Sequence, residues 1–153
     1  NIHEVDDSEF KIGNLKISSE YICHPGPTVG YRITLNEKTV AYIPDHEPAL
    51  GSNNFPKNAE WTSGYNLAKD VDLLLHDAQY KKDEYVSRVG WGHCTMTDAI
   101  DFAEMANAKK ILFFHHDPAH TDNQLKQLFI DSLKGRNNKT EVELAEEGRT
   151  YII

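Results

Sequence analysis

The sequence has few cysteines and no long apolar segment, and both absences narrow what the protein can be. Two cysteines, Cys23 and Cys94, occur in 153 residues. They are too few for a disulfide framework and are typical of a reducing compartment, so we expect a cytoplasmic protein. No apolar run approaches the roughly 20 residues that a membrane-spanning helix needs, and we expect no membrane partner.

Basic residues and phosphate-binding loops are also scarce. The chain has 16 Lys and Arg against 24 Asp and Glu, which gives a formal net charge of −8. Nucleic acids and anionic membranes are bound mainly through clusters of Lys and Arg, and the sequence has no such cluster. A Gly-rich phosphate-binding loop is absent as well, which argues against a metal-free phosphatase.

Hydrophobic periodicity predicts a single domain over residues 1–153, with strands first and alternating helices and strands later. The class is therefore α/β, a mixed sheet flanked by helices. Apolar alternation and short apolar runs predict strands at 10–23 (a hairpin), 29–35, 39–43, 72–75, 111–114, 141–144 and 149–153. Thr95 and Thr121, each followed three residues later by Asp98 or Gln124, predict the starts of two helices. Trp61, Tyr65 and Ala68 share one face of a further predicted helix, and residues 49–57 form a polar loop that serves as a lid or a simple connection.

Residues that can bind metal ions or carry protons gather where predicted strands end. Strands of one sheet that end at a shared rim bring such side chains together, and the rigid sheet then holds them in place. Imidazole and carboxylate are the donors that suit Zn²⁺, Mn²⁺ or Fe²⁺. The strand ends in question carry His24; Asp45 with His46; His76 with Asp77; and His115 with His116 and Asp117.

Several of these residues also have purely structural interpretations. His24 precedes Pro-Gly, and an ordinary position in a turn explains it as well as metal binding does. Capping of a turn explains Asp45 equally well. Asp77 with His93 forms either a structural hydrogen-bonded pair or a proton shuttle. Cys94 beside His93 suggests a thiol nucleophile, although adjacent residues of an extended segment point apart.

Taken in order, five segments resemble the later half of the metallo-β-lactamase superfamily, in particular its RNase Z-like phosphodiesterase branch. The segments are HPGPTVGYRI (24–33), AYIPDHEP (41–48), DLLLHDAQY (72–80), GWGHCTMTDAIDFA (90–103) and AKKILFFHHDPAH (108–120). The resemblance covers nearly the whole chain. It implies half of an αββα sandwich and a metal-dependent hydrolase.

The resemblance also implies roles for individual residues. His24 would bind one of two divalent ions, most simply Zn, with Mn or Fe as alternatives. Asp45 would bridge both ions, and His115 would bind the second. Asp77 replaces a family Glu and would orient His93, the proton donor or phosphate contact, while the ions lower the pKa of a bridging water for in-line attack. Four further residues are candidates for substrate contact or for supporting the ligands: His46, His116, Asp117 and His120.

The family's His-x-His-x-Asp-His motif, which supplies the remaining ligands, is absent from these residues. We therefore expect this chain to be the C-terminal half of a longer domain whose missing N-terminal half is its partner. The apolar surface left uncovered would favour that pairing or a homo-oligomer.

A second departure concerns the substrate. Only residues 34–40 stand where tRNA-processing members often insert a long tRNA-gripping arm. Together with the acidic balance, this favours a small phosphodiester or cyclic phosphate as substrate. The alternatives are a non-catalytic interaction module, a tRNA 3′-processing-type nuclease and a thiol enzyme that uses Cys94.

Overall fold

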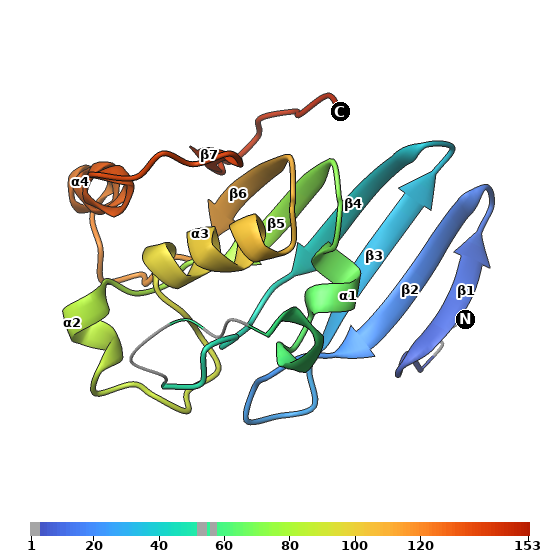
Figure 1. Ribbon diagram of the computed structural model, residues 1–153, viewed down its shortest axis with the longest axis horizontal. Coiled ribbons are helices and arrows are strands. Elements are labelled where there is room, and N and C mark those ends of the chain that lie inside the picture. The colour runs from blue at the N-terminus through green and yellow to red at the C-terminus, as the bar shows by residue number, and fades with distance from the viewer. Residues whose placement is uncertain (1–3, 52–54, 56–57) are drawn as a thin grey trace.

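A single seven-stranded sheet organises the molecule. The computed structural model describes residues 4–51, 55 and 58–153, so part of the polar loop expected at 49–57 lies outside the described residues. The strands lie side by side in the order of the sequence (Figure 1). They are β1 (Ser8–Ile12), β2 (Leu15–Tyr21), β3 (Val29–Leu35), β4 (Lys38–Ile43), β5 (Leu73–Asp77), β6 (Lys110–Phe114) and β7 (Glu141–Leu144).

The sheet changes character at β4. Strands β1 to β4 form an antiparallel meander, whereas β4, β5, β6 and β7 are mutually parallel. Parallel strands need crossover connections, and the segments between β4 and β7 supply them with helices. The carboxyl ends of β4, β5 and β6 consequently lie at one rim of the sheet. The predicted α/β class with a mixed sheet is confirmed.

The helices cover one face of the sheet (Figure 1). Their bounds are η1 (Ala59–Trp61, a 3-10 helix), α1 (Tyr65–Ala68), α2 (Lys82–Tyr85), α3 (Met96–Met105) and α4 (Asp122–Leu133). Both predicted helix starts are confirmed, since the side chains of Thr95 and Thr121 accept hydrogen bonds from the backbone N–H groups of Asp98 and Gln124. These caps satisfy N–H groups that would otherwise lack a partner at the first turn.

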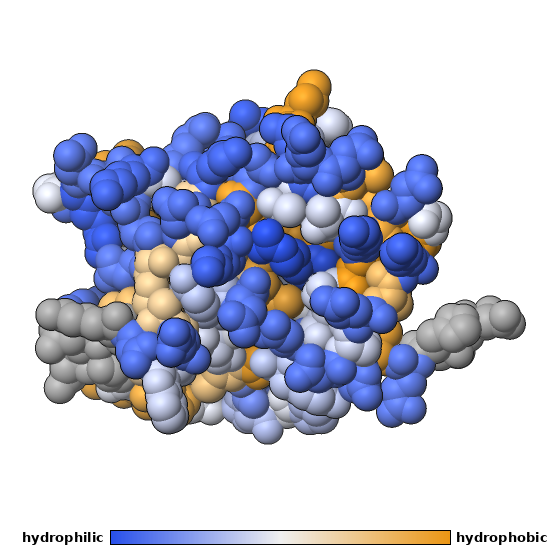
Figure 2. Space-filling model, turned by 45° about the vertical axis from the view of Figure 1, so that its right-hand side comes forward, coloured by the Kyte–Doolittle hydropathy of each residue, from blue (hydrophilic) through white to orange (hydrophobic). Residues whose placement is uncertain are grey.

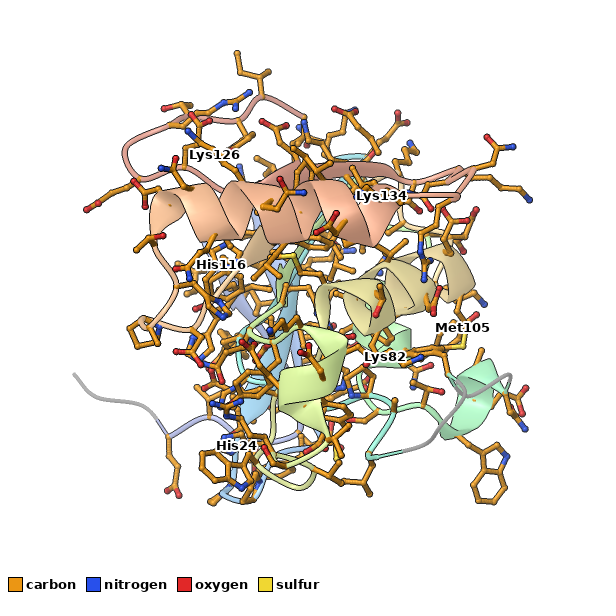
Figure 3. All side chains as sticks on the ribbon, turned by 90° about the vertical axis from the view of Figure 1, so that its left-hand side faces the viewer. His24, Lys82, Met105, His116, Lys126 and Lys134 are labelled. Atoms are coloured by element: carbon orange, nitrogen blue, oxygen red, sulfur yellow. The ribbon has the colours of Figure 1, made fainter. Side chains whose placement is uncertain are left out.

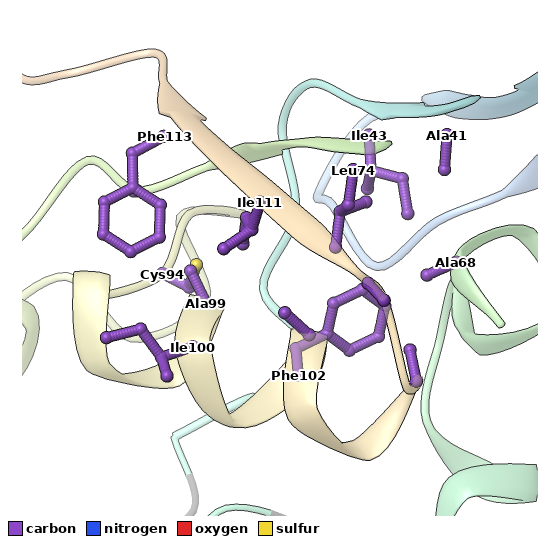
Figure 4. Packing of buried hydrophobic residues seen from close by; sticks show 14 of the residues in the cluster. Ala41, Ile43, Ala68, Leu74, Cys94, Ala99, Ile100, Phe102, Ile111 and Phe113 are labelled. Atoms are coloured by element: carbon purple, nitrogen blue, oxygen red, sulfur yellow. The ribbon is translucent and has the colours of Figure 1, made fainter. Parts of the chain in front are cut away.

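The core lies between α3 and the parallel strands (Figure 4). Ile43, Leu74 and Ile111 come from three adjacent strands, and Ile100 and Phe102 pack on them from α3. All five side chains are fully buried. The apolar spacing of α3 thus holds the helix on the strands that carry the candidate site residues at their ends.

The opposite face of the sheet carries no helix among the described residues. Alternation along the strands turns every second side chain to this open face. Four of them are large, apolar and at least 37% exposed: Ile12, Tyr21, Leu35 and Tyr42. On the side of the molecule seen in Figure 2, hydrophilic side chains cover much of the surface, with apolar atoms between them and one apolar group projecting at the top.

Two predictions of secondary structure are wrong. Residues 149–153 form no strand, although the Tyr151 ring lies against Lys110 and Arg149. Trp61 does not share a helical face with Tyr65 and Ala68, because η1 ends there and the Trp61 side chain is 86% exposed. No described helix combines the length and apolar character that crossing a membrane requires.

Candidate metal centre

Four side chains meet at the rim formed by the ends of β4, β5 and β6. Asp45, Asp77, His93 and His115 each offer one ligand atom, and these atoms all lie within 4.8 Å of one another. Asp45 follows β4, Asp77 ends β5, and His115 follows β6. The topology therefore brings together residues that are 70 positions apart, from Asp45 to His115, as the strand-end argument predicted.

Asp45 and His115 face each other directly. His115 Nε2 lies 3.1 Å from Asp45 Oδ1, yet this buried oxygen has no hydrogen-bond partner. Close approach without hydrogen-bond geometry suits two ligands of one ion better than an ion pair. His115 also has a φ of 56°, in the left-handed region that a non-glycine residue rarely adopts. Strain of this kind is concentrated at functional sites.

His93 reaches this rim from a different segment. Residues after β5 pair with those before α3, since Tyr80 N–H donates to the Cys94 carbonyl and Met96 N–H donates to the Tyr80 carbonyl. His93 Nδ1 consequently lies 2.6 Å from Asp77 Oδ2, and its ring stacks on that of His115 with centroids 4.9 Å apart. This contact occupies Nδ1, and His93 Nε2 has no hydrogen-bond partner among the residues that the structure describes.

The buried carboxylate of Asp77 is surrounded by donors. Besides His93, it accepts hydrogen bonds from the backbone N–H groups of His46, Gln79 and Cys94. Burial is the largest influence on Asp77 and raises its pKa even against these hydrogen bonds, which favour the ionised form. Burial likewise opposes charge on His93. The hydrogen bond and negative charge of Asp77, helped by Asp45, outweigh it and raise the pKa of His93.

His24 borders the cluster without joining it. Its ring meets the His93 ring edge-on, with centroids 5.7 Å apart, and Figure 3 labels it in the lower part of the view, well below His116. His24 Nδ1 lies 2.9 Å from the Thr28 hydroxyl and also accepts a hydrogen bond from the Gly26 N–H at 3.2 Å. These contacts hold the imidazole in place through Nδ1. Its predicted role as a ligand stays a prediction.

The donors fit a divalent ion of the zinc class. Asp45, His115 and the bordering His24 supply carboxylate oxygen and imidazole nitrogen, the set that such ions prefer. The unpartnered Asp45 Oδ1 is the atom that most requires a cation, because a buried carboxylate oxygen without a partner is costly. Asp77 has its oxygens engaged by N–H groups and fits the orienting role better than that of a ligand.

His46 and His76 lie elsewhere than the strand-end pattern predicted. Both are fully buried among core residues, with His46 Nδ1 2.9 Å from His76 Nε2 and both rings against Phe102. Of the two roles predicted for His46, substrate contact is opposed by the full burial of its side chain. Only its backbone N–H, which donates to Asp77, supports the site.

The last three candidates occupy the turn before α4. His116 Nδ1 lies 3.4 Å from the Ala78 carbonyl, and burial lowers its pKa. Asp117 accepts from the backbone N–H of Ala119. His120 Nε2 lies 3.0 Å from Glu84 Oε1 and does not cap α4. Substrate contact by these three stays a prediction.

Cys94 is no candidate nucleophile. Its side chain is buried, its thiol donates to the Asp77 carbonyl, and burial raises its pKa well above the usual value. A nucleophilic cysteine needs the opposite environment, which lowers the pKa. The interpretation of Cys94 with His93 as a thiol-dependent site is therefore wrong.

Sequence reasoning missed one buried charged residue beside the site. Glu47 is 1% exposed and accepts hydrogen bonds from the segment that precedes His93. A glutamate directly after Asp45 and His46 was the only signal in the sequence.

Comparison with known proteins identifies the family. A family model described as a beta-lactamase superfamily domain matches residues 1–116. The chain belongs to the metallo-β-lactamase superfamily. Ribonuclease Z from Salinibacter ruber is 29% identical over 118 residues, which are 74% of this chain and 30% of that protein. This superfamily member is thus RNase Z-like, as the motifs predicted.

Solved structures agree on the fold. The metallo-β-lactamase fold protein YhfI from Bacillus subtilis superposes with a TM-score of 0.66 at 20% identity, covering 94% of this chain and 52% of that one. A diphosphatase from the PhnP family superposes with a TM-score of 0.62 at 18% identity, covering 97% and 47%. The chain therefore spans about half the length of these superfamily structures, and 30% of the Salinibacter ribonuclease Z.

Proposed function

We propose that this chain supplies one half of the metal centre of a phosphodiesterase that acts on a small phosphodiester or cyclic phosphate. The proposal rests on one observation: candidate metal ligands and an oriented histidine lie together at one rim of the sheet. Asp45 and His115 face each other as ligands would, and beside them Asp77 holds His93 with one nitrogen free. A scaffold that had lost its chemistry would have no need to keep an oriented histidine with a raised pKa there.

Asp45, His115 and His24 would hold the metal, with Zn²⁺ favoured over Mn²⁺ or Fe²⁺ by the mixture of imidazole and carboxylate. Two ions bound there would lower the pKa of a water molecule and neutralise charge on the phosphate. Three protein ligands are too few for two ions, so a second segment with further ligands belongs to the proposal.

His93 would act on the leaving group. Asp77 keeps a proton on Nδ1 and raises the pKa of His93, so that the ring is cationic more often near neutral pH. Its Nε2 then carries a proton that it donates to the leaving alkoxide oxygen. Matching the pKa of the donor to the working pH is what general acid catalysis requires.

The partner would be the first half of the sandwich. The open face of the sheet exposes Ile12, Tyr21, Leu35 and Tyr42, and no described helix covers it. Apolar faces of this kind pack against a second layer, here a second sheet about 10 Å away. Without that layer, association of two open faces is the competing outcome.

The proposed preference for a small substrate rests on the short connection between β3 and β4 and on the net charge of the chain. The two strands are joined by Asn36 and Glu37 alone, which leaves no arm for a folded RNA at this position. The net charge of −8 also opposes a polyanion. A tRNA 3′-processing nuclease is the second candidate, favoured by the name of the Salinibacter relative.

One experiment separates these functions. The chain is purified alone and with an added N-terminal half that carries His-x-His-x-Asp-His, and each sample is assayed for bound zinc, for hydrolysis of a 2′,3′-cyclic nucleotide and for cleavage of precursor tRNA. We expect zinc and cyclic-nucleotide hydrolysis in the combined sample, both lost on chelation and in Asp45→Ala. Cleavage of tRNA alone would favour the second candidate, and a combined sample without zinc would contradict both.

A further inference from the structure

Glu47 is a buried carboxylate beside the candidate metal centre, and both of its oxygens accept hydrogen bonds. Its Oε1 accepts from the Tyr85 hydroxyl at 2.6 Å and from Gly90 N–H at 2.8 Å, and its Oε2 accepts from Gly92 N–H at 2.9 Å. A charge with 1% exposure is costly unless donors replace the lost water. Such hydrogen bonds are stronger than neutral ones, so this contact fixes the segments that make it.

The donors and the backbone of Glu47 belong to three different segments. Glu47 lies two residues after Asp45, and its own N–H donates to the Cys23 carbonyl at 3.0 Å, directly before His24. Gly90 and Gly92 lie directly before His93. One side chain with its backbone therefore ties together the loops that carry Asp45, His24 and His93.

The contact with Gly92 also sets how closely two of these loops approach. A Cβ atom on Gly92 would lie 2.1 Å from His24 Cδ2 and 2.6 Å from Pro25 Cδ, and Gly92 has a φ of 88°. Only glycine fits this position. The Gly92 backbone is thus pressed against the His24 ring, and its N–H is held by Glu47 from the other side.

We propose that Glu47 is a positioning residue that fixes the distance between His24 and His93 by holding the backbone at Gly90 and Gly92. The predicted effect of Glu47 on metal binding rests on the proposed function, whereas its predicted effect on the distance between His24 and His93 does not. A carboxylate is required because both oxygens accept. In Glu47→Gln one oxygen becomes an NH₂ group, so either Gly92 or the pair of Tyr85 and Gly90 then faces a donor instead of an acceptor.

The test compares Glu47→Gln with the matched variant Glu104→Gln in the same chain. Glu104 Oε1 also accepts two backbone N–H groups, from Lys139 and Thr140, but far along α3 from the site. Proton NMR reports the contacts of Gly92 with the His24 ring and of His24 with His93. The contact of His76 with Phe102, whose centroids are 4.9 Å apart, serves as an internal reference for the core. A Co²⁺ titration of the sample combined with the N-terminal half reports metal affinity.

We expect Glu47→Gln to lose the Gly92–His24 and His24–His93 cross-peaks while the His76–Phe102 cross-peak remains, and to weaken Co²⁺ binding about tenfold or more. Glu104→Gln should leave all of these unchanged. Wild-type cross-peaks in Glu47→Gln, or equal losses in both variants, would overturn the proposal. A wild-type combined sample that binds no Co²⁺ contradicts the proposed function alone, since the NMR contacts still decide the role of Glu47.

Tyr85→Phe keeps the proposal testable if Glu47→Gln does not fold. It removes one donor to Glu47 without creating a clash between two donors. The Gly92–His24 cross-peak should weaken but persist, and an unchanged cross-peak would overturn the proposal.

Discussion

Two groups of chelating side chains lie at neighbouring sequence positions and end in opposite environments. Asp45 and Asp77 point to the rim, where they meet His115 and His93, whereas His46 and His76 follow or precede them by one residue and are buried against Phe102. In β5 the alternation of side chains along the strand separates His76 from Asp77, while Asp45 and His46 lie just beyond the end of β4. Chelating residues that adjoin in sequence thus divide into a candidate site and a part of the core.

The largest expected effect concerns the buried pair. His76→Ala removes the partner of His46 Nδ1, leaves a cavity under α3, and should lower the free energy of unfolding by about 3 kcal/mol. Denaturant unfolding measures this change. Co²⁺ affinity of the folded protein should stay near wild type. A large loss of affinity without a loss of stability would mean that His76 belongs to the site.

The rim should respond in the opposite way. His115→Ala removes a candidate ligand whose side chain is 37% exposed, and should weaken Co²⁺ binding about 100-fold, or about 2.7 kcal/mol. Stability without metal should change little, because few packing contacts are lost. A Co²⁺ titration and a denaturant curve of the same variant give both values. Unchanged affinity would remove His115 from the proposed centre.

The sequence predicted the strands and helix caps better than the direction in which individual side chains point. The strand bounds at 29–35 and 141–144 are confirmed, and so are the caps at Thr95 and Thr121, because apolar alternation and capping are local properties. The meeting of Asp45 with His115 followed from strands that end at one rim. Which of two adjacent residues faces the rim depends on strand register, and sequence spacing does not determine that.

Other features depended on contacts that no local pattern records. The segment 149–153 has the apolar character of a strand, but the Tyr151 ring lies against Lys110 and Arg149 instead of continuing the sheet. Glu47 was missed because its meaning comes from Gly90 and Gly92, 43 and 45 positions away. The interaction is formed only after the sheet has brought the loops together.

The third prediction uses pH to separate the two groups. Burial lowers the pKa of His76 to about 4, and that of His46 well below the ordinary value of 6.5, so the folded pair is neutral. Because the unfolded state binds these protons more readily, stability is present above pH 6.5 and is lost as the pH falls toward 4. For His76 alone, the free energy of unfolding should fall by about 2 kcal/mol between pH 7 and 5.

His93 has the opposite sign, and this provides the control. Its raised pKa adds stability that is present below the unfolded value and is lost as the pH rises through the folded value. Denaturant unfolding at pH 7 and 5 should therefore be compared between wild type and His76→Ala, in which only the buried pair is broken. Equal pH dependence in the two proteins would contradict the assignment of His46 and His76 as a neutral pair.

The smallest effect is expected at Cys94, which contacts both groups. Its sulfur lies 3.2 Å from the Asp77 carbonyl and 3.9 Å from His76 Nδ1. The hydroxyl in Cys94→Ser can donate to the same carbonyl, so we expect a loss of about 1 kcal/mol of stability and unchanged Co²⁺ affinity and hydrolysis. Hydrolysis abolished at wild-type stability would instead mean that sulfur acts chemically. That outcome would require the buried thiol to ionise beside the negative charge of Asp77, the environment that raises its pKa.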